Sequence, residues 1–155
     1  MFSQQLTILK NTDIRQRHDG SRRSPWNEVE CGDHYVRPLA SWVLLEAATG
    51  YRYDATRESL AFAPRLSPDN FCSFFITGSG WGVFSQSGNC ARLGLDFGSL
   101  NLKELCLKTG CTDAAVHLGE QAVATDIERI DGLMRLRFTE PVTVAAGEAL
   151  TVTFA

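Results

Sequence analysis

The sequence has no long hydrophobic run and no leader-like N-terminus. No stretch of about 18 consecutive apolar residues occurs, so we expect no membrane-spanning helix. The first residues, MFSQQLTILKNTD, have no basic start followed by an apolar run, so we expect no secretion signal and a cytoplasmic protein. Apolar residues make up 44% of the 155 residues and charged residues 21%, which is typical of a globular chain.

Cysteine pairs are also missing. The five cysteines, at positions 31, 72, 90, 106 and 111, are odd in number, scattered, and form no CxxC motif. This spacing argues against a disulfide framework and against a zinc ribbon. We therefore expect the thiols to be small buried apolar groups in a reducing compartment.

Charge of one sign does not accumulate. The net charge is −3, and the only basic clusters are Arg15/Arg17 and Arg22/Arg23, so a nucleic-acid partner is not expected. The glycine-rich GSGWG at residues 78–82 is not a phosphate loop and lacks the frame of a nucleophile elbow. We expect no cofactor.

Residues 1–50 are predicted to be helical with a long loop. A helix is expected to begin near Pro38, whose missing N–H needs no partner in a first turn, and to run through LASWVLLEAAT. Gly50 is the expected stop. Because this helix is apolar on nearly every side, either the β region or a second copy of the chain must cover it, and we predict a homo-oligomer if the chain is made alone.

Residues 51–155 alternate like strands. We expect a bulge at Lys103/Glu104, where the apolar parity switches, and a tight hairpin at Asp131-Gly132. Trp81 is predicted to be a core or bulge residue and not a sugar platform. The expected inward faces are Leu93, Leu95, Phe97; Leu100, Leu102; Leu105, Leu107; Met134, Leu136, Phe138; Val142, Val144; and Leu150, Val152, Phe154.

Together these patterns predict an α+β chain. Its helical segment at 1–50 is followed at 51–155 by eight to ten short strands in an antiparallel, sandwich-like region.

Residues 15–42, RQRHDGSRRSPWNEVECGDHYVRPLASW, resemble a segment of bacterial glycoside hydrolase family 116, in which a variant of NPWNEVECGDHYARxMASW recurs. Residues 62–86, FAPRLSPDNFCSFFITGSGWGVFSQ, resemble the continuation of the same glucosylceramidase and β-glucosidase-like proteins. The chain departs from them in having Ser24 where asparagine is usual and Val36-Arg37-Pro38 where small residues are commoner.

The resemblance implies that the N-terminal segment is the end of an (α/α)6 barrel. Members of the family cleave β-glucosides or glucosylceramide with retention, using two carboxyl groups that lie upstream of the matched region. We therefore expect a C-terminal fragment or accessory domain that contacts sugar, lacks the catalytic pair and is not active alone.

One loop concentrates the groups that bind sugars. Charged and amide side chains bind hydroxyls in pairs, and an aromatic ring covers the apolar sugar face. The alternative is an internal network in which Glu28 or Glu30 pairs with Arg37. The candidate saccharide-binding residues are Trp26, Asn27, Glu28, Glu30, His34 and Arg37.

Catalytic and metal interpretations of this loop are weaker. Glu28 and Glu30 in an extended chain would lie about 6.6 Å apart on one side, whereas glycoside hydrolysis needs carboxyl groups that flank the bond. The spacing of Glu30, Cys31, Asp33 and His34 matches no standard metal site, and a Cys31/His34 nucleophile pair lacks an orienting third group. A stand-alone carbohydrate-binding or oligomerising module, and a small hydrolase using Glu28/Glu30, stay open as alternatives.

Overall fold

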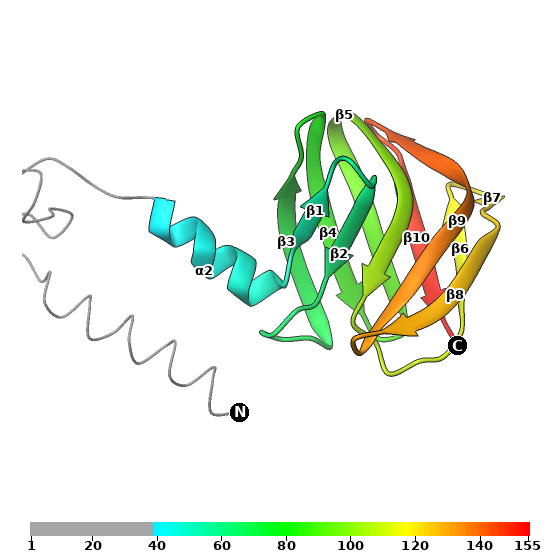
Figure 1. Ribbon diagram of the computed structural model, residues 1–155, viewed down its shortest axis with the longest axis horizontal. Coiled ribbons are helices and arrows are strands. Elements are labelled where there is room, and N and C mark those ends of the chain that lie inside the picture. Colours follow the sequence, from blue (N-terminus) through cyan, green and yellow to red (C-terminus); the bar gives the residue numbers. More distant parts are fainter. Residues whose placement is uncertain (1–38) are drawn as a thin grey trace, which may run out of the picture. The chain divides into compact units, whose positions relative to one another are not determined.

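The computed structural model describes residues 39–155. The chain divides into two compact units, residues 1–45 and residues 46–155. The predicted saccharide-binding loop, Trp26 to Arg37, and the predicted barrel segment before residue 39 lie outside the described residues. The described residues comprise one helix and the β-rich unit that comes after it in the sequence (Figure 1).

Helix α2 covers Leu39–Thr49, as the sequence predicted. It ends at Gly50, whose φ of 61° places it in the left-handed region and whose N–H donates to the Glu46 carbonyl at 2.8 Å. A Cβ at this glycine would stand 2.5 Å from the Ala63 carbonyl oxygen. Both the left-handed backbone and the lack of space for a side chain therefore require glycine at this position. No helix in the described part of the chain is long and apolar enough to cross a membrane.

Ten strands follow within the described residues. They are β1 (Arg52–Asp54), β2 (Ser59–Phe62), β3 (Asn70–Ile76), β4 (Gly80–Ser87), β5 (Cys90–Leu107), β6 (Ala114–Leu118), β7 (Gln121–Ala122), β8 (Thr125–Ile130), β9 (Leu133–Ala145) and β10 (Ala149–Phe154).

Strand β5 connects the whole sheet because its 18 residues serve two sets of neighbours. Residues 90–98 pair with β4, and residues 90–94 also pair with β10. Residues 99–107 pair with β9, and residues 104–107 also pair in parallel with β2. The result is one mixed ten-stranded sheet.

The predicted fold class was therefore wrong. Instead of an α/α barrel end and an antiparallel sandwich, the described residues form a single mixed sheet with one short helix. Side-chain alternation reports which face a residue occupies but not the direction of its neighbour, so the parallel β2–β5 pairing gave no signal. The apolar runs at 93–97, 100–102 and 105–107 all belong to the single strand β5.

Several local predictions are confirmed. The register of β5 and β9 shifts between Leu102 and Glu104, at the expected bulge. Asp131 and Gly132, with φ values of 53° and 79°, form the two-residue turn between β8 and β9. Phe97 is an exception, because its side chain is 64% exposed. The register with β4 shifts between Trp81 and Gly82, which leaves Asp96 of β5 as an extra residue and reverses the facing of β5 before Phe97.

The core lies between the two halves of the sheet. Phe62 of β2 and Phe84 of β4 stack with ring centroids 3.9 Å apart and an interplanar angle of 5°, and both are fully buried. Phe75 meets the edge of Phe62 at 6.0 Å. The predicted inward residues of β9 and β10 surround this aromatic centre, so the alternation identified most of the core correctly.

Candidate functional site

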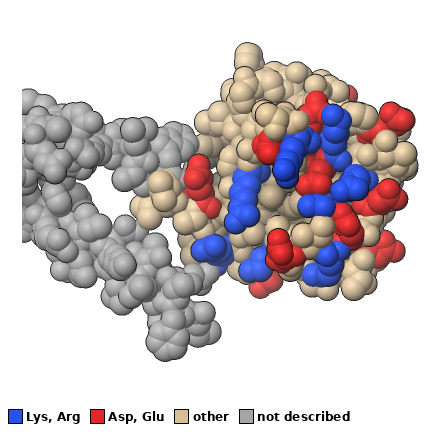
Figure 2. All heavy atoms as spheres, in the orientation of Figure 1, with Lys and Arg blue, Asp and Glu red and all other residues tan. Residues whose placement is uncertain are grey.

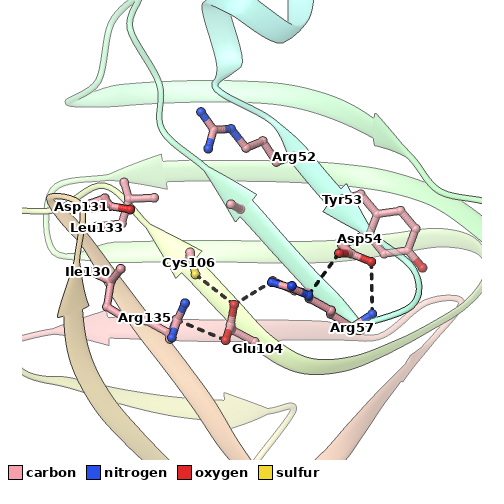
Figure 3. A pocket seen from close by; sticks show the side chains of 12 residues that line it. Arg52, Tyr53, Asp54, Arg57, Glu104, Cys106, Ile130, Asp131, Leu133 and Arg135 are labelled. Atoms are coloured by element: carbon pink, nitrogen blue, oxygen red, sulfur yellow. Dashed lines mark hydrogen bonds and ion pairs between the residues drawn. The ribbon is translucent and has the colours of Figure 1, made fainter.

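The described residues contain a hollow on the outer face of β1, β2, β5 and β9, with a volume of about 300 Å³. Figure 2 shows basic and acidic side chains interspersed over this face. Figure 3 shows the side chains that line the hollow, with Tyr53 and Asp54 at one end and Arg135 and Ile130 at the other.

Strand register explains why the hollow is there. One cross-strand row runs from Arg52 through Ala61 and Cys106 to Arg135. Ser59 and Glu104 are neighbours in the adjacent row. The small side chains of Ser59, Ala61 and Cys106 therefore form the floor, while longer side chains rise on both sides. Neighbouring strands are about 4.8 Å apart, so three small residues on two central strands leave a depression only a few ångströms wide.

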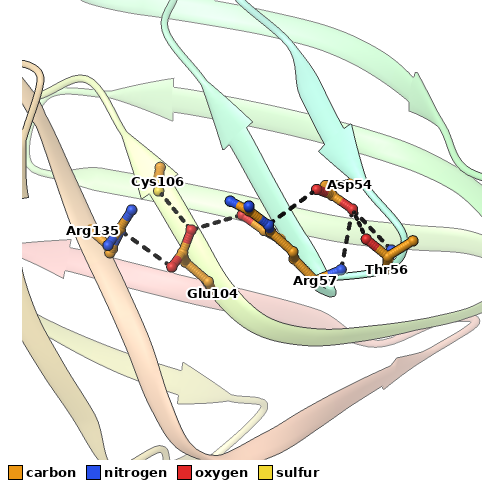
Figure 4. A network of polar contacts seen from close by, with 7 residues as sticks. Asp54, Thr56, Arg57, Glu104, Cys106 and Arg135 are labelled. Atoms are coloured by element: carbon orange, nitrogen blue, oxygen red, sulfur yellow. Dashed lines mark hydrogen bonds and ion pairs between the residues drawn. The ribbon is translucent and has the colours of Figure 1, made fainter.

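Glu104 is the centre of a polar network on this floor (Figure 4). Its Oε1 accepts a hydrogen bond from Ser59 Oγ at 2.8 Å and a weaker one from Cys106 Sγ at 3.6 Å. Its Oε2 lies 3.2 Å from Arg135 Nε, an ion pair without hydrogen-bond alignment. Both carboxylate oxygens of Glu104 are thus already engaged by the protein.

Arg135 is held from two sides. Its Nη1 donates to Glu128 Oε1 at 3.0 Å, while its Nε faces Glu104. The hydrogen bond to Glu128 raises the pKa of Arg135, so this guanidinium stays charged at any pH at which the protein is folded. With its side chain only 25% exposed, Arg135 is a fixed positive wall of the hollow.

Asp54, on the side of the hollow opposite Arg135, stabilises a turn. Its Oδ1 accepts hydrogen bonds from the Thr56 hydroxyl at 2.7 Å, the Thr56 N–H at 2.9 Å and the Arg57 N–H at 3.1 Å. These bonds, the one from the Thr56 hydroxyl above all, hold the pKa of the Asp54 carboxyl below its usual range. Asp54 is therefore an ionised acceptor that shapes the turn after β1, and it cannot supply a proton.

Cys106 on the floor is predicted to be unreactive. Burial, with a smaller contribution from the Glu104 charge, raises the pKa of Cys106 to about 11. Because only the thiolate is nucleophilic, we expect iodoacetamide at pH 8 to label Cys106 far more slowly than Cys72, which is exposed on β3. Replacing Glu104 with Gln removes a negative neighbour, so we expect the labelling of Cys106 to accelerate, as peptide mass spectrometry would measure. Equal labelling rates for the two thiols in the unmodified chain would contradict this assignment.

The exposure of Cys72 also corrects a prediction, because the thiols were expected to be buried. Cys72 points outward between the inward Phe71 and Phe75 of β3, and Cys90 and Cys111 are half-buried. Within the part of the chain that the structure describes, only Cys106 behaves as a small buried group. Among residues 39–155, no three His, Cys, Asp or Glu side chains gather closely enough to hold a metal ion.

A second surface feature is an apolar stripe across the outer face of β3, β4 and β5. Ile76 pairs with Trp81, and Trp81 pairs with Phe97, so the three side chains are direct cross-strand neighbours. They are 52%, 49% and 64% exposed. Trp81 adjoins the β4 register shift, as its predicted bulge role requires, whereas Phe84 lies in the core.

The residues of the hollow were not singled out from the sequence. The alternation in β9 placed Arg135 and Arg137 opposite the core, which was a usable signal. Glu104 and Ser59 are 45 positions apart and meet only through the parallel pairing of β2 with β5. The spacing of these residues in the sequence does not predict that they are in contact.

Comparisons with known proteins give only distant similarity, to solved structures. No family model and no curated protein sequence matches the chain. Part of one solved glycoside hydrolase, a GH127 β-arabinofuranosidase, is similar in structure with a TM-score of 0.41 and 13% sequence identity. The similarity covers 65% of this chain and 18% of that enzyme, so the chain spans less than a fifth of its length. The resemblance to family 116 stays a prediction.

Proposed function

We propose that the chain is a non-catalytic accessory part of a β-glycosidase-like protein and that its β unit contacts saccharide at the outer hollow. The observation that carries the proposal is the composition of this hollow, a small-residue floor ringed by planar charged groups. Shallow sites of this kind suit sugars, whose adjacent hydroxyls bind carboxylates and guanidinium groups in pairs.

The same residues argue against hydrolysis at the hollow. Glycoside cleavage needs one carboxylic acid that holds a proton and a second, charged carboxylate across the bond. Asp54 is fixed in the ionised form by its turn, and Glu104 is engaged at both oxygens. Neither of these carboxyl groups is available for the acid role, and the remaining one on the lining, Asp131, has no second free carboxyl group to act with, so we propose binding without turnover.

Filling the floor tests the proposal. We expect the 155-residue chain to bind β-linked oligosaccharides in isothermal titration while releasing no nitrophenol from nitrophenyl β-glucoside. Ala61→Leu places a larger side chain on the floor and should weaken binding by about tenfold or more, which corresponds to ~1.4 kcal/mol. Ala115→Leu makes the same change at an exposed position of β6 and should leave binding unchanged. Hydrolysis by the chain, or equal affinities of the two variants, would refute the proposal.

The apolar stripe supports a second candidate, an oligomerising module. Ile76, Trp81 and Phe97 form a contiguous exposed apolar surface, and such surfaces mark protein contacts more often than solvent-facing positions. A second copy of the chain is the occupant we propose, because a two-fold axis would place the uncharged stripe of one copy against that of the other.

Light scattering after size-exclusion chromatography tests this second candidate. We expect the molar mass of the unmodified chain to rise with concentration and the mass of Phe97→Lys to stay at the monomer value, because an ammonium group cannot be buried unpaired between the stripes. Thr153→Lys, at an exposed position of β10, is the matched control and should assemble normally. An unmodified chain that remains monomeric at every concentration would eliminate the oligomer.

A further inference from the structure

We infer that the saccharide held at this hollow is acidic, that is, a sugar bearing a carboxylate; the inference rests on the proposed function. The hollow continues into a second one on the same face, because both are lined by Arg57 and Glu104. The second has a volume of about 330 Å³ and adds Lys103 and Arg137. We call the two together the arginine groove.

The groove gathers basic side chains on a negative protein. Five basic side chains line it, together with the acidic side chains Asp54, Glu104 and Asp131, and two further carboxylates, Glu58 and Glu128, pair with Lys103, Arg135 and Arg137 beside it. Arg52, Arg57 and Arg137 have no ion pair shorter than 3.6 Å, and these exposed guanidinium groups favour anions over neutral ligands of the same shape. The five basic residues are Arg52, Arg57, Lys103, Arg135 and Arg137.

Hydrogen-bonding capacity points the same way. Few carboxylate acceptors are left: Asp54 accepts three hydrogen bonds through one oxygen and Glu104 is engaged at both, so Asp54 Oδ2 and the Asp131 carboxylate remain. The exposed guanidinium donors, in contrast, have no short partner. Arg57 reaches Asp54 only at 3.6 Å, and Arg137 reaches Glu128 only at 3.6 Å, distances too long for hydrogen bonds. Arg52 makes no ion pair or hydrogen bond through its side chain within the described residues.

A ligand of this groove must therefore supply acceptors. A guanidinium carries five N–H donors in a planar fork that matches a carboxylate in bidentate fashion. The present ion pairs of Arg57 and Arg137 are solvent-exposed, with side chains 82% and 58% accessible, and exposed pairs contribute little. Both guanidinium groups can exchange these partners for the carboxylate of a uronic acid without loss of a strong interaction.

A pair of oligosaccharides that differ only in charge tests the inference on the full chain. We would titrate cello-oligosaccharides and the same oligomers oxidised at C6 to glucuronate. We expect the oxidised oligomers to bind at least about tenfold more tightly, since one charge-assisted hydrogen bond is worth that factor, and the preference to fall as salt is added. Equal binding of both oligomers would overturn the inference and leave the proposed function standing. Binding of neither would remove both.

Arginine variants locate the preference. In Arg57→Gln/Arg137→Gln two of the three exposed guanidinium groups of the groove become neutral, and we expect affinity for the oxidised oligomer to fall much further than affinity for the neutral one, so that most of the preference disappears. Arg65→Gln removes one charge from an exposed position that does not line the groove and should keep the preference. Circular dichroism of each variant confirms that it is folded. A preference retained in the double variant would place the acidic-sugar site elsewhere and overturn the assignment.

Discussion

Phe84→Ala should lower the free energy of unfolding by about 3–5 kcal/mol, a large part of the stability of a domain of this size. Phe84 is fully buried and stacks on Phe62, which belongs to the other half of the sheet, so truncation opens a cavity where the two halves meet. Its ring is also 6.1 Å from Phe71, so the loss extends to a third aromatic side chain. Urea denaturation should show a midpoint lower by about 2 M.

Phe97→Ala is the matched control. The same atoms are removed from the same strand pair, but Phe97 is 64% exposed, and surface substitutions usually change stability by less than about 0.5 kcal/mol. A Phe84→Ala variant no less stable than Phe97→Ala would mean that the halves of the sheet do not pack through the Phe62–Phe84 stack.

Gly98→Ala should cost about 2–4 kcal/mol, because two separate penalties apply to it. The φ of 82° is one that side-chain-bearing residues rarely adopt. An added Cβ would also stand 2.0 Å from the Ser79 carbonyl oxygen, and that atom is backbone and cannot simply turn away. The substitution would push β4 and β5 apart where β5 passes from one set of neighbours to the other. Thermal unfolding followed by circular dichroism gives the measurement.

Substitutions at two other glycines distinguish the cost of the left-handed backbone from the cost of the steric clash. Gly88 has a φ of 55° but open space around its Cβ position, so Gly88→Ala should cost only about 1 kcal/mol. Gly110 has open space and no left-handed backbone, so Gly110→Ala should be close to neutral. If Gly98→Ala were as mild as Gly88→Ala, the close approach of the Ser79 carbonyl would not constrain the fold.

Features that depend on neighbours in sequence were predictable. The helix stop at Gly50, the Asp131-Gly132 turn and the Lys103/Glu104 bulge each follow from a few adjacent residues and the faces they must occupy. The inward faces of β9 and β10 followed from alternation alone. The facing of Phe97 was predicted wrongly because the extra residue Asp96 reverses the facing of β5 between Leu95 and Phe97, and no residue in this run marks the bulge.

Features that depend on distant pairing were not predictable. The groove requires Ser59 to lie beside Glu104 and Cys106 beside Arg135, and both neighbours are set by register across β2, β5 and β9. No single segment contains enough of the groove to be recognised. The sugar-binding residues proposed from the sequence, Trp26 to Arg37, are contiguous in the chain, which is the kind of site that a linear pattern can suggest.

The pairing of β5 with two sets of strands also affects how the molecule folds. Its four principal partners, β2, β4, β9 and β10, come from both sides of it in the sequence, so neither half of the sheet can be completed by a local hairpin alone. Closing such distant contacts is slow, because loop entropy is lost before the contacts form. In the folded protein both halves of the sheet contain part of β5. If either half unfolds, β5 loses the hydrogen-bonded partners that belong to that half. We therefore expect a slow, all-or-none folding transition for residues 52–154 without a stable half-sheet intermediate.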